Sequence, residues 1–474
     1  MNSISQEHLY QLLRRFNPWW NGADTASLQL PGIRRRAFGE VLETIENPHL
    51  RRYAVISGPR RVGKTTTMRQ VIAHLLERGV PAANILYVSF DNPLLKLAGF
   101  ERAIRAYEES TPHNGTCYYF LDEVQYADEW SLWLKDLYDN RPEIRAVATG
   151  SASPEIKRGL SDSGVGRWRD LRMPTMSFRE YCTLTGVEIH LPSTLPKVEE
   201  LPTLPKAEFT ELMNKLGGLT PHWNRYLLCG GFPELAFNPD TLACQLCMRE
   251  DVVDKVLKRD IPALFDVRNA LQLEKVFLYL CFESGDLVNY ATICRDLDGL
   301  AKSTLQRYIR YLQDANLIYV SNPAGESGKM LLKGNPKIYV ADAGMRLACL
   351  MMPDLLEDAV QLGKSAESTV FKHFHDAYCT TARPGYVRLG RNDKEVDIVM
   401  DFLNGKRLAC EVKYRHDATI RSGEAIRTLC AHPDTLAAFV ATRGSADFGL
   451  DTRTKGAARP LVRIPAQALC YLLG

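Results

Sequence analysis

The feature that most constrains this chain is the segment 58–65, which fits the phosphate-binding loop pattern G-x-x-x-x-G-K-[ST]. An apolar run at 53–56 precedes it and is typical of a buried strand, and the amphipathic stretch 65–78 that follows is typical of a helix. Backbone N–H groups of such a loop and of the helix N-terminus converge on phosphate oxygens. The pattern therefore predicts a nucleotide site, with Lys64 at the β- and γ-phosphates and the Thr65 hydroxyl on Mg²⁺. The residues expected to hold the nucleotide here are Gly58, Pro59, Arg60, Arg61, Val62, Gly63, Lys64, Thr65 and Thr66.

The overall composition is ordinary for a globular protein and shows no strong charge bias. Of the 474 residues, 45% are hydrophobic, and 59 Lys and Arg nearly balance 56 Asp and Glu to give a formal net charge of +3. Because that length is too great for one hydrophobic core, about three domains are expected. No apolar run reaches the ~18 residues of a membrane-spanning helix, and the N-terminus lacks a basic segment followed by an apolar one. We therefore expect a cytoplasmic protein with no membrane partner.

Four runs rich in Val, Ile and Tyr, each ending at a polar residue, alternate with helical patterns at 53–57, 85–90, 117–122 and 144–149. Such alternation favours an α/β fold with a parallel sheet and helices on both faces. Before these runs, residues 1–50 carry a short helical pattern at 9–16, and we expect them to pack as an arm on the α/β domain. After them, repeated Leu-Pro pairs in 186–206 break the pattern and indicate a linker or insertion.

Two carboxylates and a hydroxyl complete the expected nucleotide site. Asp122 and Glu123 end the third apolar run, where Asp122 is expected in the Mg²⁺ shell and Glu123 as the group that polarises the attacking water. The fourth run ends in Thr149-Gly150-Ser151, which can place a hydroxyl near the γ-phosphate, and Ser151 is counted among the nucleotide-binding residues. Arg167 is expected to offer a cation to the site of a neighbouring subunit, although a solvated arginine is the ordinary interpretation of such a residue.

These motifs resemble those of bacterial and archaeal AAA-type ATPases that join a P-loop domain to a winged helix and a C-terminal domain of restriction-endonuclease-like fold. The matching stretches, spread in order over most of the chain, are 58–65, 121–125, 149–151, 166–167, 177–181, 230–234, 259–261 and 337–342. The resemblance implies a parallel AAA-type α/β sheet with a helical lid, then a winged helix and a mixed α/β nuclease-like domain. It divides the chain into an N-terminal arm (1–50), a P-loop ATPase core (51–185), a Pro-rich linker and helical lid (186–262), a winged helix (263–345) and a restriction-endonuclease-like domain (346–474).

Within the expected winged helix, the segment 304–316 is laid out as a recognition helix with Ser303 as its N-cap. Helix 287–297, the pair Asp298-Gly299 and a hairpin at 317–340 would supply the first limb, the turn and the wing. The residues that could contact DNA from this helix are Lys302, Arg307 and Arg310. Many winged helices bind protein instead, and an interdomain packing role stays open.

The C-terminal region carries a D…E-x-K pattern on two expected strands, of the kind that divalent-metal nucleases use. Asp397 and Glu411 would coordinate Mg²⁺ or Mn²⁺, and Lys413 would orient or deprotonate water. Period-2 spacing puts Glu411 and Lys413 on one face of their strand. Glu367, on a preceding helix, resembles the additional acidic ligand of many such folds. Because charged residues at strand ends are common, the nuclease-like assignment depends on the family resemblance.

The leading hypothesis is an ATP-hydrolysing enzyme whose nucleotide state controls a DNA-binding winged helix and a metal-dependent nuclease-like domain. Its expected cofactors are ATP and Mg²⁺, with Mn²⁺ as a second candidate metal at the C-terminal site. The alternative is an ATP-switched protein-interaction module whose nuclease-like fold is catalytically inert, and a third hypothesis, a motor acting on DNA or on a partner, requires a ring. The expected partners are DNA, other copies of this chain, and a protein bound through the C-terminal domain.

Overall fold

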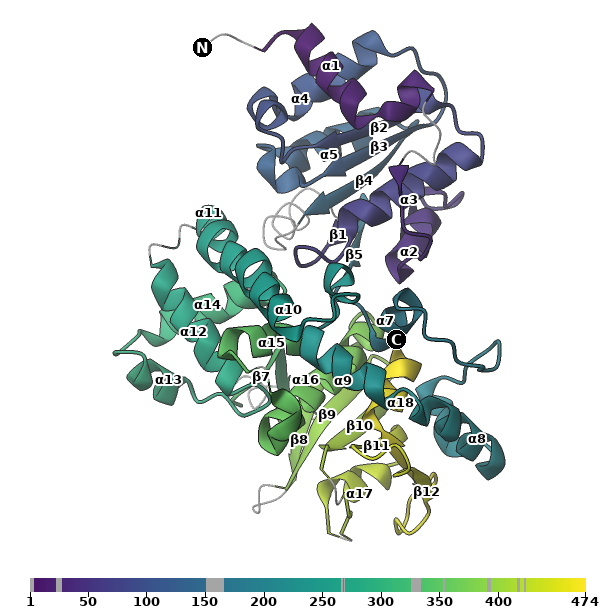
Figure 1. Ribbon diagram of the computed structural model, residues 1–474, viewed down its shortest axis with the longest axis vertical. Coiled ribbons are helices and arrows are strands. Elements are labelled where there is room, and N and C mark those ends of the chain that lie inside the picture. Colours follow the sequence, from purple (N-terminus) through teal and green to yellow (C-terminus); the bar gives the residue numbers. More distant parts are fainter. Residues whose placement is uncertain are drawn as a thin grey trace. The chain divides into compact units, whose positions relative to one another are not determined.

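The computed structural model describes residues 4–22, 28–150, 166–265, 267, 269–324, 334–352, 354–389, 394–415, 418–421 and 423–474. The chain divides into two compact units (Figure 1). The first consists of Met1–Pro174 with Asp314–Asn316, and the second of Thr175–Gln313 with Leu317–Gly474. The five-part division expected from the sequence stays a prediction.

The first unit is built on a five-stranded sheet in which every neighbouring pair of strands is parallel. In the order β2-β3-β4-β1-β5, its strands are β2 (Ile85–Ser89), β3 (Cys117–Asp122), β4 (Ile144–Gly150), β1 (Tyr53–Ser57) and β5 (Trp168–Arg172). The four predicted strands are confirmed to within one residue at their ends. Strand β5 was not predicted, because this edge strand exposes two of its five residues and lacks the continuous apolar run of a central parallel strand.

Helices cover both faces of this sheet (Figure 1). Helices α1, α4 and α5 share a hydrophobic core with Val55 and Val88 of the strands, and α2 packs with α3. The helical segments of the unit are α1 (Gln6–Phe16), η1 (Pro18–Asn21), α2 (Arg36–Ile45), α3 (Lys64–Glu77), η3 (Ala82–Asn84), α4 (Pro93–Ser110), η4 (Val124–Tyr126) and α5 (Trp130–Asn140).

The N-terminal segment packs on the edge strand β2. The Asn17 side chain donates to the Tyr87 carbonyl at 2.8 Å and accepts the Tyr87 N–H at 2.6 Å. The indole N–H groups of Trp19 and Trp20 both donate to the Ile85 carbonyl, at 3.0 and 2.9 Å. These side chains satisfy backbone groups that an uncovered edge strand would leave unpaired.

The second unit contains a mixed eight-stranded sheet in the order β12-β13-β11-β10-β9-β8-β6-β7. Its strands are β6 (Ile318–Pro323), β7 (Lys337–Val340), β8 (Ala382–Leu389), β9 (Lys394–Phe402), β10 (Arg407–Lys413), β11 (Thr435–Thr442), β12 (Gly449–Asp451) and β13 (Leu461–Pro465). The strands predicted near 385–389, 395–400, 407–413 and 436–441 are confirmed as β8 to β11. The hairpin predicted at 317–340 is confirmed as β6 and β7, and its strand β6 also pairs in parallel with β8, which makes the hairpin continuous with the C-terminal sheet.

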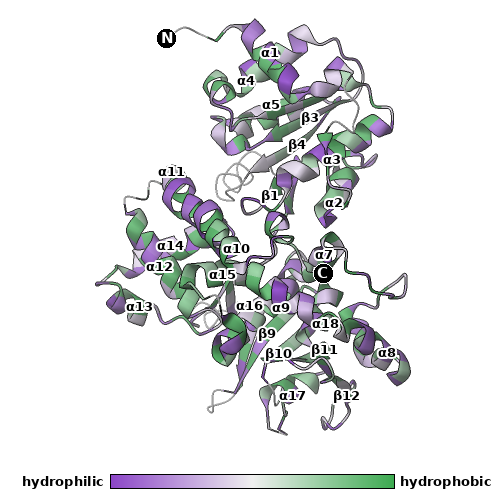
Figure 2. Cartoon of the chain, viewed as in Figure 1, coloured by the Kyte–Doolittle hydropathy of each residue, from purple (hydrophilic) through white to green (hydrophobic). Residues whose placement is uncertain are grey.

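Helices pack on both faces of this sheet. Helix α17 covers a core that includes Val396, Ala409 and Val440, whereas α16 packs on the opposite face, where Phe374 contacts Phe439. Helix α18, hydrophobic along almost its whole length, packs against α16 (Figure 2). The helical segments of the unit are α7 (Phe178–Leu184), η5 (Val198–Thr203), α8 (Lys206–Gly217), α9 (Thr220–Cys229), η6 (Pro233–Leu235), α10 (Thr241–Cys247), the π-helical segments Met248–Asp254 and Val256–Asp260, α11 (Ile261–Phe265), α12 (Ala270–Phe282), α13 (Tyr290–Asp296), α14 (Lys302–Asp314), α15 (Ala343–Leu350), η10 (Leu355–Glu357), α16 (Ala359–Tyr378), α17 (Ala425–Cys430) and α18 (Ala466–Leu473).

The two helices expected of a helix-turn-helix are α13 and α14. Between them, Asp298 and Gly299 have φ angles of 55° and 75°, the left-handed conformations of a tight turn. Helix α14 begins at Lys302, so Ser303 lies inside it instead of capping it. In the described part of the chain, no helix is long and apolar enough to cross a lipid bilayer.

Candidate functional site

The predicted phosphate-binding loop connects β1 to α3 at the carboxyl end of the parallel sheet. A side chain at Gly58 would place its Cβ 2.1 Å from the Met173 carbonyl oxygen, so this position needs glycine. Arg61 and Gly63 have φ angles of 61° and 98°, which curl the backbone before the helix begins at Lys64. The loop is thus held between β1 and the segment that follows β5.

The two side chains at the start of α3 lie where the loop pattern predicts them. Lys64 is buried, and its ammonium donates to the carbonyls of Gly58 at 2.9 Å and Pro59 at 2.8 Å. The Thr65 hydroxyl donates to Asp122 Oδ2 at 2.9 Å, which brings together two residues expected to hold Mg²⁺. Strand β3 and the loop therefore meet at one edge of the sheet.

Asp122 is buried and is held by hydroxyl groups. Besides Thr65, the Tyr87 hydroxyl donates to its Oδ2 at 2.8 Å, and the Thr149 hydroxyl donates to its Oδ1. Burial raises the pKa of the carboxyl above its usual range, and the hydrogen bonds from Thr149, Tyr87 and Thr65 oppose that rise. A carboxylate beside a threonine hydroxyl is a donor set that fits Mg²⁺, a hard cation that prefers oxygen ligands.

Glu123 follows Asp122 in the left-handed conformation, with a φ angle of 53°. Its backbone N–H donates to the Thr149 hydroxyl at 3.0 Å, and its carboxylate accepts a hydrogen bond from Gln125. Thr149 thus links the two acidic residues, whereas the sequence predicted only that a hydroxyl of 149–151 lies near the γ-phosphate. Tyr87 was missed, because a tyrosine inside an apolar strand looks like any core residue.

The remaining predicted loop residues have structural partners or lie beside the site. Arg60 donates to the Tyr126 hydroxyl at 2.9 Å, and the Val62 carbonyl accepts from Arg35 at 2.9 Å. Thr66 is half-buried in the first turn of α3. Ser151 lies outside the described residues.

Arg167 lies at the amino-terminal end of the parallel strands, whereas the loop lies at their carboxyl end. The residue after it, Trp168, pairs with Tyr53, the first residue of β1, whereas the loop follows the last residue of that strand. The guanidinium forms a two-fold contact with Asp139 of the same unit, at 2.8 and 2.9 Å. Arg167 is therefore not placed to act on the loop of its own chain, and its role in a neighbouring subunit stays a prediction.

In the second unit, the predicted residues Glu367 and Asp397 lie around a lysine that the sequence analysis did not single out. Lys337 Nζ lies 3.6 Å from Glu367 Oε1 and 3.2 Å from Asp397 Oδ1, and it also forms an ion pair with Glu395. We call Glu367, Glu395 and Asp397 the carboxylate cluster. Lys337 belongs to the stretch 337–342, one of those that resemble the AAA-type ATPase family. A lysine at the start of a short strand does not, however, indicate from its neighbours in sequence that it will contact these carboxylates.

Glu411 and Lys413 lie on β10, next to β9, as the D…E-x-K pattern predicts. Lys413 Nζ lies 2.6 Å from Glu424 Oε2 and 3.8 Å from Glu411 Oε1. Among the residues that the structure describes, Glu411 Oε2 is buried without a hydrogen-bond partner. Burial and the charge of Asp397 raise the pKa of both Glu411 and Glu367 above the usual range of a glutamate, while Lys413 opposes the rise at Glu411 and Lys337 opposes it at Glu367. Glu424, the partner of Lys413, was missed because it lies in a loop before α17.

A divalent metal does not fit this arrangement. Both oxygens of Asp397 are engaged, one by Lys337 and the other by the Val412 N–H at 2.9 Å. Glu367 Oε1 accepts the Tyr339 hydroxyl at 3.0 Å. Among the described residues, no group of three or more His, Cys, Asp or Glu side chains is arranged to hold a metal ion.

Helix α14 presents the three basic residues expected to contact DNA. Lys302, Arg307 and Arg310 are exposed, while Leu305 and Ile309 are buried on the inner face. The predicted amphipathic layout is thus confirmed. DNA contact itself stays a prediction.

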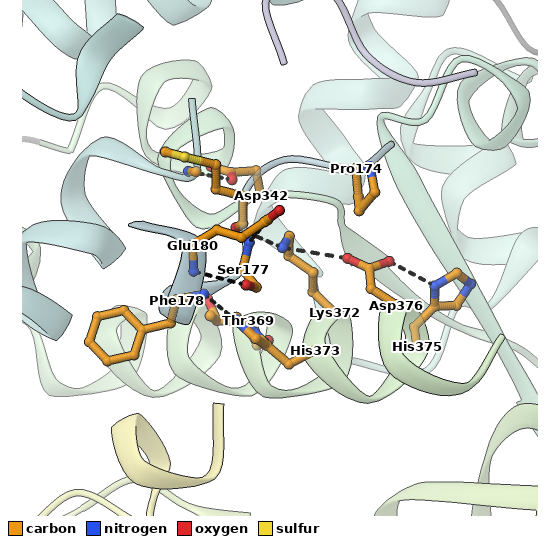
Figure 3. Close-up of polar contacts among 12 residues, drawn as sticks. Pro174, Ser177, Phe178, Glu180, Asp342, Thr369, Lys372, His373, His375 and Asp376 are labelled. Carbon is orange, nitrogen blue, oxygen red and sulfur yellow. Dashed lines mark hydrogen bonds and ion pairs between the residues drawn. The ribbon is translucent and has the colours of Figure 1, made fainter. Parts of the chain in front are cut away.

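A buried polar network lies where the chain enters the second unit (Figure 3). The Phe178 N–H donates to His373 Nε2 at 2.8 Å, and His373 Nδ1 lies 2.7 Å from the Thr369 carbonyl. Lys372 donates to the Met176 carbonyl at 3.1 Å and lies 3.4 Å from Asp376. Burial lowers the pKa of His373 to about 3, so the ring is neutral and its Nε2 can accept a hydrogen bond.

Comparison with known families finds a match over most of the first unit. Residues 50–182 match the family model described as an AAA domain. The first unit resembles the AAA-type P-loop ATPase domain. Residues 220–356 and 362–461 match two families described as domains of unknown function, DUF8612 and DUF4143. Those matches name neither a winged helix nor a nuclease.

Several similar proteins are described as uncharacterised. One from Haemophilus influenzae is 24% identical over 355 residues, which cover 73% of this chain and 78% of the relative. One from Methanocaldococcus jannaschii is 26% identical over 67% of this chain and 66% of its own length. One from Mycobacterium tuberculosis is 25% identical over 76% of this chain and 69% of its own length.

Two solved structures share low overall similarity with the chain. The ORC1 protein of Aeropyrum pernix, solved in complex with DNA, is 13% identical, with a TM-score of 0.27 over 67% of this chain and 91% of its own. AMPPCP-bound DnaA from Aquifex aeolicus is 17% identical, with a TM-score of 0.26 over 60% of this chain and 89% of its own. Similarity this low says nothing about function.

Proposed function

We propose that this protein binds ATP at the loop of the first unit and hydrolyses it. The observation that carries the proposal is the contact between Thr65 and Asp122 beside Lys64, which joins the loop to the acidic end of β3. The family match of residues 50–182 supports the same conclusion.

Each residue has a role that follows from its position. Backbone N–H groups at the start of α3 and the Lys64 ammonium would bind phosphate oxygens. Thr65 and Asp122 would hold Mg²⁺, which, when bound, neutralises charge on the phosphates. Glu123, with Gln125 bonded to its carboxylate, would accept a proton from the attacking water.

Measurement of ATP turnover and nucleotide affinity on purified protein tests the proposal. We expect Lys64→Ala to weaken nucleotide binding at least about tenfold, because a hydrogen bond to a charged group contributes roughly 1.5–3 kcal/mol. A matched control is Lys135→Ala, a change of the same kind on α5. Native protein that neither binds nor hydrolyses ATP would overturn the proposal.

For α14 we propose contact with a DNA backbone. Its support is the exposed row of Lys302, Arg307 and Arg310 after a tight turn. The continuity of the β6–β7 hairpin with the larger sheet argues against a freely projecting wing. Binding of duplex DNA, followed by fluorescence anisotropy at several salt concentrations, tests it, since loss of one phosphate contact reduces the salt slope by about 0.9. An unchanged slope in Arg307→Ala would favour the packing role.

For the second unit, the two hypotheses were a metal-dependent nuclease and an inert interaction module. The ion pairs of Lys337 with Glu367, Glu395 and Asp397 favour the inert module, because they engage the carboxylates that a nuclease would need for metal. We therefore propose that the second unit is a catalytically inert interaction module and that it does not cleave nucleic acid. Incubation of plasmid and single-stranded DNA with protein, Mg²⁺ or Mn²⁺ and ATP tests this, and Asp397-dependent cleavage would restore the nuclease hypothesis.

A further inference from the structure

We propose that Lys337 is the resident cation of the carboxylate cluster, so that this site is closed to the divalent metal that its D…E-x-K pattern predicts. The inference concerns the second unit alone and does not depend on nucleotide binding by the first.

The side chain of Lys337 is built into the interior of the unit. It is 4% exposed, and it reaches from the first residue of β7 to Glu367 on α16 and to Glu395 and Asp397 on β9. One ammonium thereby joins three elements of the fold. A buried ammonium needs such carboxylates, because the loss of water would otherwise leave its charge uncompensated.

The acceptor groups around Lys337 are oriented by donors of the protein itself. The Val412 N–H fixes the second oxygen of Asp397, and the Tyr339 hydroxyl fixes Glu367. Among the described residues, Glu411 Oε2 is buried without a hydrogen-bond partner, but this oxygen alone falls short of the several oxygen ligands that Mg²⁺ or Mn²⁺ requires. A divalent ion beside Glu367 and Asp397 would also lie within a few ångströms of the ammonium and would be repelled by it.

The central measurement is Mn²⁺ binding by nucleotide-free, full-length protein, followed by electron paramagnetic resonance of the free ion. The informative quantity is the binding that is lost on Asp397→Asn, because any Mn²⁺ held by the first unit is the same in both chains. We expect no Asp397-dependent binding by the native chain at millimolar Mn²⁺.

The matching variant is Lys337→Met, which keeps the length of the side chain and removes its charge. We expect it to lower the melting temperature of the second unit by roughly 5–15 °C, because removal of one partner leaves buried carboxylates uncompensated. We also expect it to gain an Asp397-dependent Mn²⁺ site, with Mn²⁺ restoring part of the lost melting temperature. The control is Lys364→Met on the same helix as Glu367, since the partner of Lys364 is the exposed Asp286.

The outcomes separate cleanly. Asp397-dependent Mn²⁺ binding by the native chain would overturn the proposal, and this measurement stands even if Lys337→Met fails to fold. A folded Lys337→Met chain with native melting temperature and no Mn²⁺ binding would also overturn it, because the ammonium would then neither balance the cluster nor exclude a metal.

Discussion

Two buried lysines in this chain lie near carboxylates in different ways. Lys64 donates to loop carbonyls, and the neighbouring Asp122 is held by the hydroxyls of Thr65, Tyr87 and Thr149. Lys337 forms ion pairs with the carboxylate cluster. Carbonyls and hydroxyls stabilise a charge without cancelling it, whereas an ion pair cancels it.

This difference separates a site that can take a charged ligand from one that resembles such a site in sequence. A magnesium nucleotide brings anionic phosphates and a cation, which a lysine and a carboxylate in separate positions can receive. In the carboxylate cluster, the lysine and the carboxylates already form ion pairs with one another. Acidic residues at strand ends therefore predict a metal site only when no internal cation reaches them.

The largest expected effect is that of Glu123→Gln on ATP turnover. The amide keeps the shape of the side chain but cannot accept a proton, so turnover should fall by about 10²–10⁴-fold while nucleotide affinity stays near native. Single-turnover hydrolysis and equilibrium nucleotide binding measure the two quantities. The control is Glu129→Gln, an exposed glutamate after the same strand. Native turnover in a folded Glu123→Gln chain would show that Glu123 does not activate the water.

The same change of aspartate to asparagine in both places tests the comparison directly. Asp122→Asn should weaken the apparent affinity for Mg²⁺ in nucleotide binding about 10–100-fold, the range found for metal affinity when partners of a metal site are removed. Asp397→Asn should leave ATP turnover and its Mg²⁺ dependence unchanged, because Asp397 belongs to the other unit. Titration of Mg²⁺ at fixed ATP gives both values. An equal loss in the two variants would mean that the units share one metal-dependent step.

Sequence patterns predicted most of the central framework. The loop at 58–65 and the strands β1 to β4 and β8 to β11 all follow from local periodicity and motif spacing. These features are predictable because each is encoded within a few neighbouring residues. Strand β5 was missed because two of its five residues are exposed, which breaks the apolar run that marks a buried strand.

The contacts that decide the chemistry were less predictable. Lys337 and Glu367 are far apart in sequence, and nothing in either local pattern indicates their meeting. Tyr87 reaches Asp122 from a neighbouring strand in the same way. The parallel pairing of β6 with β8, which joins the hairpin to the sheet, likewise depends on the tertiary fold. Pairwise contacts between distant elements are the part that a single sequence hides.

The smallest expected effect concerns a third way to bury a titratable group, which is to keep it neutral. Lys372, Asp376 and Glu180 are the charged groups around His373, and burial holds its pKa at about 3, below the ~6.5 of an unfolded histidine. As the pH falls below ~6.5, this histidine is protonated in the unfolded chain but stays neutral in the folded chain, so the free energy of unfolding falls. Between pH 7 and pH 5 the loss amounts to about 2 kcal/mol.

The variant His373→Gln sharpens this expectation, because its amide oxygen can still accept the Phe178 N–H but does not titrate. Hydrogen exchange of the α16 amides gives the free energy of opening at pH 7, 6 and 5. We expect the native chain to lose about 2 kcal/mol more than the variant over this range. His432→Gln, a change at an exposed histidine of the same unit, should retain the native pH dependence. If native and His373→Gln chains lose the same stability, another group controls the acid sensitivity of α16, and neutrality of His373 does not explain how this network tolerates burial.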